Sequence, residues 1–259
     1  MTNSVYTPKD FKRLRFAGDI VSRALDHIGQ FVKPGISTAE LDAIVAAFLK
    51  ANGAESSCLG YRGYPKSCCT SVNDVIVHGI PRGDEILKTG DIINIDLTAE
   101  AKGFHADSSR MFYVGAVSDH AARLCETAKD CMNSAISICG PGVPLSEIGR
   151  VIESMAAAKG YSVSKDFVGH GIGKVMHDDP QIYHFYDRRL DSVIMVPGMV
   201  FTIEPMLCEC SSASVIDSDG WTARTKDGRL SAQWEHTIGI TEEGCEIFTV
   251  TKERGDDGT

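Results

Sequence analysis

Two aspartates near the middle of the chain could do chemistry together. Asp96 lies in the run from Gly90 to Thr98, where apolar and polar residues alternate as in a strand with one buried face. A second strand, predicted from about Ala106 to Tyr113, carries Asp107. A hairpin centred between Ala101 and Lys102 sets the two aspartates directly opposite each other, where they need a shared proton or a cation. A register shifted by one residue leaves both in water.

The segments before this hairpin read as two helices. Thr7, Pro8 and Asp10 form a helix start, with a capping hydroxyl, a proline at the first position and an acid at the third. This helix is predicted to stop at the Lys33-Pro-Gly35 turn. A second helix opens in a capping box between Ser37 and Glu40 and ends at Gly53.

The same order of elements returns later in the chain. One helix is predicted from Ser118 to the Pro141-Gly142 turn and another from Ser146 to Gly160. Pro34-Gly35 aligns with Pro141-Gly142 at an offset of 107 residues, and Gly53 aligns with Gly160 at the same offset. We interpret this as two halves, residues 8–115 and 116–251, related by a pseudo-twofold axis; chance recurrence of Pro-Gly turns is the alternative.

The repeat adds two more acids to the first pair. The segment that ends at Asp96 matches Met195–Glu204 at an offset of 108 residues, so Glu204 takes the position of Asp96. The predicted counterpart of Asp107 is Glu235, in a strand-like run where Gln233, Glu235 and Thr237 share one face. Its offset of 128 requires about twenty extra residues in the second hairpin, which the polar segment 208–229 can supply. A last strand is predicted from Cys245 to Thr251.

Four converging carboxylates call for cations, and one histidine fits beside them. Divalent ions would neutralise acids that could not all stay ionised in a cleft. His170 is flanked by Gly169, Gly171 and Gly173, which allow close backbone approach, and an imidazole is a natural fifth ligand. Carboxylates with one imidazole suit Mn, Fe, Co or catalytic Zn. The set indicates metal-assisted hydrolysis, with a bridging hydroxide as nucleophile and one carboxylate as proton carrier.

Composition narrows the class of protein. The 259 residues are 43% hydrophobic and 24% charged, which is ordinary for a globular chain. The net charge of -9 argues against a partner nucleic acid held on a broad basic surface. Nine cysteines without a Cys-x-x-Cys pair fit neither a disulfide framework nor a zinc ribbon. With no apolar secretory segment and no membrane span expected, a reducing, cytoplasmic setting is the simplest interpretation.

The ordered residues resemble a known family. The order of five residues resembles that of the dinuclear metal site of pita-bread peptidases: Asp96, Asp107, His170, Glu204 and Glu235. The sequence motifs around them are similar to those of type I methionine aminopeptidases. The similar segments span about residues 8 to 250, and they are Cys58–Ser67, Val77–Pro81, Gly90–Asp96, Gly169–Gly173 with His177, Phe201–Met206, Gly220-Trp221 and Ser231–His236. The resemblance implies an α+β pita-bread fold, a central curved antiparallel sheet flanked by four main helices, as one catalytic domain over residues 8–251. A short arm, residues 1–7, precedes it, and a disordered tail, residues 252–259, follows.

The resemblance also implies roles for the site residues. Asp96 would chelate one divalent ion (Co, Mn, Fe or Zn), His170 and Glu204 the other, and Asp107 and Glu235 would bridge them. Glu204 would shuttle the proton, His177 would polarise the scissile carbonyl, and His78 would contact the leaving amide nitrogen. The pocket for the methionine side chain would comprise Cys58, Tyr61, Tyr64, Met176 and Trp221. The family's monovalent-cation ligands correspond to Asn73, Val75 and Ser231.

Four residues depart from the family pattern, namely Arg62, Cys68, Met176 and Trp234. They bear on the shape of the pocket and leave the ligand set intact.

The implied substrates are the amino termini of nascent polypeptides with a small second residue, which the protein would meet at the ribosome. The protein is expected to be a monomer and to bind neither a membrane nor a specific nucleic-acid sequence. The alternatives are a proline-specific peptidase with the same ligands, a binding protein that has lost its metals, and a cysteine-built zinc module.

Overall fold

A computed structural model describes residues 4–251; the predicted disordered tail at 252–259 and the first residues of the predicted arm lie outside the described residues. The helices are α1 (Pro8–Gly29), α2 (Thr38–Ala51), α3 (Asp119–Ser137), α4 (Ser146–Ala158) and the short 3-10 turns η1 (Tyr61–Gly63) and η2 (Arg188–Leu190). The strands are β1 (Glu55–Ser56), β2 (Cys69–Val72), β3 (Val75–Val77), β4 (Ile92–Ala101), β5 (Phe104–Tyr113), β6 (Ser162–Val163), β7 (Gly169–Gly171), β8 (Asp178–Ile182), β9 (Val200–Ile203), β10 (Met206–Cys208), β11 (Ser214–Ile216), β12 (Ala223–Thr225), β13 (Ser231–Gln233), β14 (His236–Ile240) and β15 (Cys245–Ile247).

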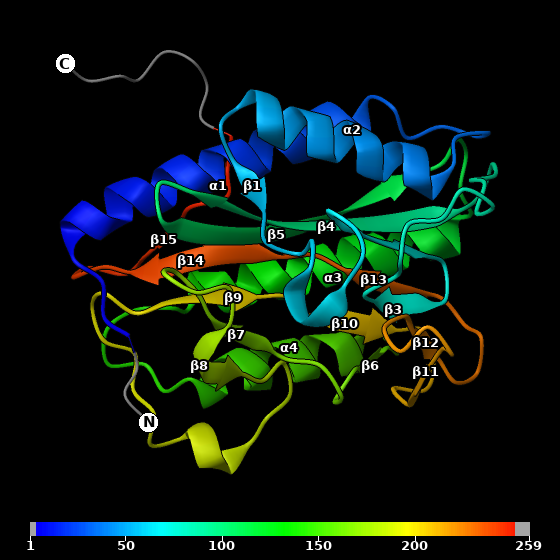
Figure 1. The fold of residues 1–259 in the computed structure, drawn as a ribbon. Helices are drawn as coiled ribbons and strands as arrows, with labels where there is room; N and C mark the ends of the chain where they lie inside the picture. Colours follow the sequence, from blue (N-terminus) through cyan, green and yellow to red (C-terminus); the bar gives the residue numbers. More distant parts are fainter. Residues whose placement is uncertain (1–3, 252–259) are drawn as a thin grey trace.

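Helices α1 and α2 run along one side of the β4–β5 hairpin (Figure 1). The predicted caps are confirmed: Thr7 with Asp10, and Ser37 with Glu40, each form a reciprocal capping box. Helix α1 ends at Gly29, earlier than the predicted turn at Lys33. Apolar residues of α1 and α2, among them Leu25 and Val45, pack on the inner face of β4 in one buried cluster.

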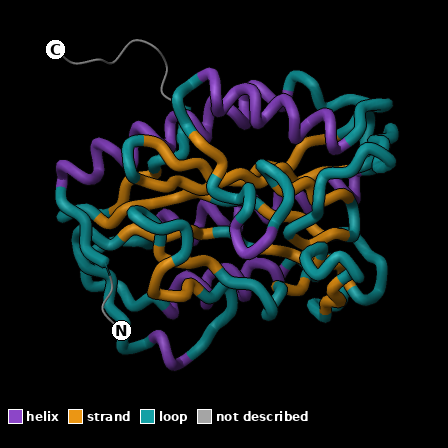
Figure 2. Tube along the Cα trace, in the orientation of Figure 1, coloured by secondary structure: helices purple, strands orange, loops and turns teal. Residues whose placement is uncertain are grey.

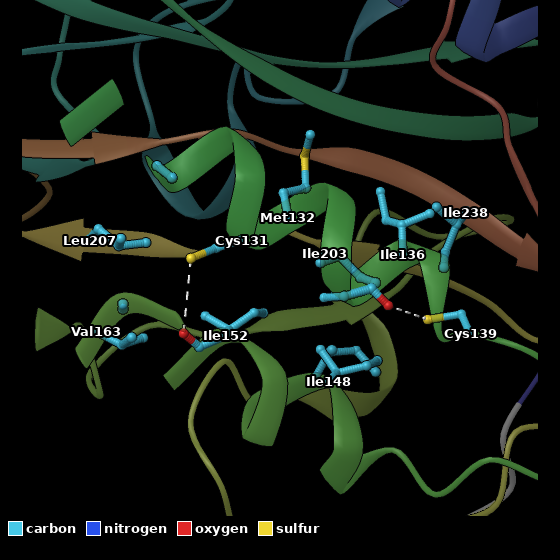
Figure 3. Packing of buried hydrophobic residues seen from close by; sticks show 14 of the residues in the cluster. Cys131, Met132, Ile136, Cys139, Ile148, Ile152, Val163, Ile203, Leu207 and Ile238 are labelled. Atoms are coloured by element: carbon cyan, nitrogen blue, oxygen red, sulfur yellow. Dashed lines mark hydrogen bonds between the residues drawn. The ribbon is translucent and has the colours of Figure 1, made fainter. Parts of the chain in front are cut away.

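A second apolar cluster lies in the other half of the structure. It joins α3 and α4 to β9, β10 and β14, and Figure 3 shows Met132, Ile148 and Ile203 among its side chains. The thiol of Cys131 on α3 contacts the carbonyl oxygen of Ile152 on α4 at 3.9 Å. The strands therefore lie between two helical layers, as the trace coloured by secondary structure also shows (Figure 2).

The first hairpin forms, but the predicted register is wrong by two residues. Asp96 pairs with Ser109, and Asp107 pairs with Thr98. The turn is centred on Lys102 and Gly103, which both have positive φ (55° and 80°), as a tight two-residue hairpin turn requires. A shift of two keeps both aspartates on the same face, because side chains alternate with a period of two. They are diagonal neighbours, and their carboxyl groups still interact.

In the second hairpin, both strands are interrupted at their acids, Glu204 and Glu235. The pairs Ile203↔His236 and Met206↔Gln233 flank the gap, and this register sets Glu204 opposite Glu235. The predicted continuous strand through Glu235 is therefore wrong, since β13 ends at Gln233 and β14 begins at His236. The predicted equivalence of Glu235 with Asp107 is inexact for the same reason: Glu235 faces its partner acid directly, whereas Asp107 faces Asp96 diagonally.

The extra residues of the second hairpin form a smaller hairpin of their own. Strands β11 and β12 pair with each other, and β12 also pairs with β3. The last strand, β15, is shorter than predicted and ends at Ile247. Within residues 4–251, no helix has the length and apolar run that a membrane crossing requires. The limits of the two halves and of the single domain stay predictions.

Candidate metal and peptide site

A cavity of about 680 Å³ opens between the two hairpins. Its walls come from β2, β4, β5, β7 and from the junctions beside Glu204 and Glu235. All five predicted metal ligands and all seven predicted substrate contacts line it: Asp96, Asp107, His170, Glu204, Glu235, Cys58, Tyr61, Tyr64, His78, Met176, His177 and Trp221. The structure thus gathers residues that lie up to about 180 positions apart in the sequence.

The four carboxylates share the cavity with one imidazole. Ligand atoms of Asp107, His170 and Glu235 lie within 4.8 Å of one another. The Nε2 atom of His170 is 3.8 Å from Oδ2 of Asp107 and 3.7 Å from Oε1 of Glu204. These separations exceed hydrogen-bond length.

The ring of His170 is held in one tautomer. Its Nδ1–H donates to the carbonyl oxygen of Gly171 at 3.0 Å, which leaves the Nε2 lone pair directed at the acids. Burial lowers the pKa of His170 to about 3, so the ring is neutral and cannot form ion pairs with Asp107 or Glu204.

The acids have strongly perturbed pKa values. Burial, followed by repulsion from Asp107, raises the pKa of Asp96 and of Glu235 well above the ordinary range. Burial also raises the pKa of Asp107 to about 6 and that of Glu204 to about 8, against hydrogen bonds that lower both. The polypeptide alone therefore does not hold four charged carboxylates here.

These residues fit a divalent metal. The Nε2 lone pair of His170 faces acceptor oxygens of Asp107 and Glu204, and Oδ1 of Asp107 is buried with no hydrogen-bond partner among the described residues. A cation would satisfy all of these acceptors and neutralise their charge. The set of oxygen donors with one nitrogen, and without thiolate ligands, suits a hydrolytic ion.

Two threonine hydroxyls fix the carboxylates. Thr98 donates to Oδ2 of Asp107 at 2.7 Å, and Thr202 donates to Oε1 of Glu204 at the same distance. Thr202 also accepts the backbone N–H of His170 at 3.0 Å, so one hydroxyl orients two candidate ligands. Neither threonine was predicted as a site residue, although each lies two residues from an acid on the same face of its strand.

Replacing Thr202 by valine should weaken metal binding by about 10- to 100-fold, the usual effect of losing a group that orients a ligand. Valine has nearly the same shape, so the buried position stays filled. Titration of the metal-free protein with Mn²⁺ by calorimetry measures the change, and Thr202→Ser, which keeps the hydroxyl, should restore most of the affinity. Equal affinities for the valine variant and the unaltered protein would contradict this role.

An apolar pocket adjoins the acids. Cys58, Tyr64 and Cys69 form its buried floor, with Met176 and Trp221 packed against them. The Tyr64 hydroxyl donates to backbone carbonyl oxygens of Cys68 and Gly79 at 3.0 Å, so its ring is fixed. The ring of His78 stands edge-on to Trp221, and burial lowers the pKa of His78 to about 4.

A row of neighbouring side chains, with their rings tilted against one another, begins beside the acids at His170. The ring of His177 lies 4.1 Å from that of His170, and the ring of Tyr61 lies 5.0 Å from that of His177. The guanidinium of Arg62 lies 5.3 Å from the centre of the Tyr61 ring. Partial burial, then the charge of Arg62, lowers the pKa of His177. We call these four residues the ring column.

Two of the four departures from the family pattern reach the cavity. Arg62 and Met176 line it. Cys68 packs instead in the cluster beneath α1 and α2, and the indole N–H of Trp234 donates to the carbonyl oxygen of Cys125 away from the site. Cys69 and Phe167 also line the cavity and were missed as site residues; alternation along β2 turns Cys69 to the opposite side from Cys68.

The three predicted ligands of a monovalent cation lie near one another but are engaged elsewhere. Ser231 donates its N–H to the carbonyl oxygen of Asn73 at 2.9 Å, and the Asn73 side chain bonds Ile92 N–H and Asp91. Ser231 donates its hydroxyl to the carbonyl oxygen of Leu207, and Val75 starts β3. Their role stays a prediction.

Comparison with known proteins identifies the family. The model of metallopeptidase family M24 matches residues 12–242. The methionine aminopeptidase of Escherichia coli K12 is 46% identical over 254 residues, which cover 98% of this chain and 96% of that protein. The chain belongs to the methionine aminopeptidases of family M24. The crystal structure of methionine aminopeptidase from Rickettsia prowazekii has a TM-score of 0.93, with 42% identity and coverage of 96% of this chain and 100% of that one.

Membership of the methionine aminopeptidases confirms the predicted α+β pita-bread fold. Methionine aminopeptidase A of Synechocystis is 47% identical to this chain. The matched region covers 96% of this chain and 98% of that protein. The relatives therefore match the chain end to end rather than over one module.

Proposed function

We propose that the chain removes the amino-terminal methionine from proteins and peptides by metal-dependent hydrolysis of the first peptide bond, with a preference for a small second residue. Its family makes it a metal-dependent aminopeptidase acting on nascent protein amino termini. One observation carries the proposed site: four carboxylates, three of them buried, and the free lone pair of His170 line one cavity beside an apolar pocket.

We assign the metal to the buried acids and His170. Asp96 would hold one ion, His170 with Glu204 a second, and Asp107 with Glu235 would bridge them; Co, Mn, Fe or Zn suit these donors. Bound there, the metal would supply a Lewis acid and lower the pKa of a water molecule. The donor set supports this assignment because the Nε2 lone pair of His170 faces acceptor oxygens of Asp107 and Glu204, and Oδ1 of Asp107 is buried without a hydrogen-bond partner among the described residues.

Glu204 would carry the proton that the attacking water gives up. Its pKa of about 8 without metal shows how strongly the site favours the protonated form, and nearby positive charge would lower that value toward neutrality, where a proton carrier works best. The hydroxyl of Thr202 keeps Oε1 in place. His177, next to His170, would donate to the carbonyl oxygen of the scissile bond, and His78 would contact the amide nitrogen of the leaving residue.

The apolar pocket would take the methionine side chain. Cys58, Tyr61, Tyr64, Met176 and Trp221 offer sulfur and aromatic surface of the kind that a thioether packs against. Asn73, Val75 and Ser231 would hold a monovalent cation. We also propose that the protein acts as a cytoplasmic monomer and meets nascent chains at the ribosome.

Turnover of paired peptides tests the proposal. The metal-free protein, reconstituted separately with Co²⁺, Mn²⁺, Fe²⁺ and Zn²⁺, should release methionine from Met-Gly-Met and should cleave Leu-Gly-Met at least 100-fold more slowly, since a branched side chain fits the long pocket poorly. Product amino acids are measured by mass spectrometry. Activity confined to Xaa-Pro peptides, or none with any of the four metals, would defeat the proposal.

A further inference from the structure

Arg62 differs from the other charged side chains of the cavity. Among the described residues it is the only lysine or arginine that lines the cavity, whose other charged groups are acids and histidines. Arginines such as Arg110 and Arg224 are held by carboxylates, whereas Arg62 has no ion-pair partner within residues 4–251. Its side chain is exposed. The guanidinium is therefore free to meet a ligand.

The backbone fixes the direction of Arg62. It has φ 48°, in the left-handed region that side chains other than glycine rarely adopt, between Gly60 (φ 83°) and Gly63 (φ 90°). Two backbone hydrogen bonds close the turn, from Tyr61 N–H to the carbonyl oxygen of Cys58 and from Tyr64 N–H to that of Tyr61. The turn thereby presents the guanidinium at the outer end of the ring column.

The ring column sets the reach of Arg62 along a peptide. Successive separations of 5.0 Å and 5.3 Å lead from His177 through Tyr61 to the guanidinium. An extended peptide advances about 3.3 Å per residue. The guanidinium therefore lies at most about 10 Å from the His177 ring. A substrate whose first peptide bond lies at His177 has the Cα of its third residue about 5 Å further on, and a glutamate side chain there reaches toward Arg62.

Acids share the cavity with Arg62, so the guanidinium is a local positive charge among negative ones. Asp166 accepts the hydroxyl of Ser214, and Asp178 accepts that of Ser4, both at 2.6 Å. These hydrogen bonds leave the acids charged, and Asp179 lines the cavity as well, so an acidic side chain is favoured only where it meets the N–H donors of the Arg62 guanidinium directly.

We propose that Arg62 is a specificity-determining residue that favours substrates with an acidic side chain at the third position. The inference rests on the proposed function and deepens it, because it names a class of peptide within the methionine substrates. A carboxylate at this position would accept paired hydrogen bonds from the guanidinium, whereas a lysine would be repelled.

The test compares Met-Ala-Glu-Ser, Met-Ala-Gln-Ser and Met-Ala-Lys-Ser with the Mn²⁺-loaded protein. At low salt, kcat/KM should be about two- to fivefold higher for the glutamate peptide than for the glutamine peptide, the size expected for an exposed ion pair. The lysine peptide should be the slowest. At about 0.5 M NaCl the differences should shrink, since salt screens exposed charges.

Variants locate the effect. Arg62→Gln should abolish the discrimination, Arg62→Lys should keep part of it, and Arg62→Glu should reverse the order so that the lysine peptide is preferred. A folding defect cannot produce a reversal. Arg188→Gln, which removes an equally exposed charge from η2 outside the cavity, should leave the order unchanged. Unchanged discrimination in Arg62→Gln with good turnover of the glutamine peptide overturns this inference alone; no turnover of any methionine peptide by the unaltered protein overturns the proposed function.

Discussion

Replacing Glu204 by glutamine should lower kcat by roughly 100- to 10,000-fold, the usual contribution of a positioned acid or base, while the fold survives. An amide of the same shape cannot take up the proton and gives up one anionic ligand. Steady-state release of methionine from Met-Gly-Met measures the loss.

The surroundings of Glu204 explain why the variant should still fold. Thr202 can keep donating to the remaining carbonyl oxygen, and the neighbouring Gln233 amide now donates to Oε2 at 3.3 Å. The side-chain oxygen of Gln233, Oε1, is buried with no hydrogen-bond partner within residues 4–251. A rotation of the side-chain amide would let this oxygen accept the new N–H of the variant. Glu242→Gln, at an exposed turn, is the matched control and should be fully active. Full activity of Glu204→Gln would rule out its role as proton carrier.

Removal of metal should destabilise the protein measurably. A ligand present at about 100 times its dissociation constant adds about 2.7 kcal/mol to the free energy of unfolding, which for a chain of this size corresponds to roughly 5–10 °C in Tm. We expect this gain when Mn²⁺ is added back to chelated protein at pH 8, followed by scanning calorimetry.

The gain should depend on pH in a definite direction. The folded-state pKa is raised to about 6 for Asp107, from 3.8, and to about 8 for Glu204, from 4.5. A carboxyl group with a raised pKa contributes stability that is complete below pH 4 and is lost as pH rises through the folded value. The metal-free protein should thus be less stable at pH 8 than at pH 5, and the metal-induced rise in Tm should be larger at pH 8.

The Glu204→Gln variant also serves as the control for pH. It lacks one of the raised carboxyl groups, so its metal-free Tm should fall less between pH 5 and pH 8 than that of the unaltered protein. A metal-free Tm that rises over this interval, with the same slope in both proteins, would show that these acids do not govern the dependence.

Local signals in the sequence predicted the helices well. Thr7 with Asp10 and Ser37 with Glu40 satisfy backbone donors a few residues away, so their function needs no knowledge of the rest of the fold. The first hairpin was also predicted, yet its register was not, because the turn position depends on two consecutive residues of positive φ. Gly103 satisfies this requirement at low cost, which marks Lys102-Gly103 rather than Ala101-Lys102 as the centre.

The residue patterns alone indicated the acids and His170 of the site, whereas the apolar pocket residues came from the family resemblance. Asp96 and Glu204 stand out because an acid within a largely buried strand, or directly after one, has a cost in free energy that needs a reason. Thr98 and Thr202 carry no such mark, since a threonine in a strand is ordinary until its partner is known. Arg62 was visible only as a departure from the family pattern, and its free guanidinium needed the fold to be seen.

The two apolar clusters that flank the strands have a consequence for how the site assembles. Each supports one hairpin: the cluster beneath α1 and α2 underlies Asp96, and the cluster of α3 and α4 underlies the hairpin of Glu204 and Glu235. A chain with only the amino-terminal portion folded holds two of the four carboxylates and lacks His170. Tight binding of metal by the proposed ligands would therefore report completion of folding. These ligands come from portions of the chain that emerge from synthesis at different times.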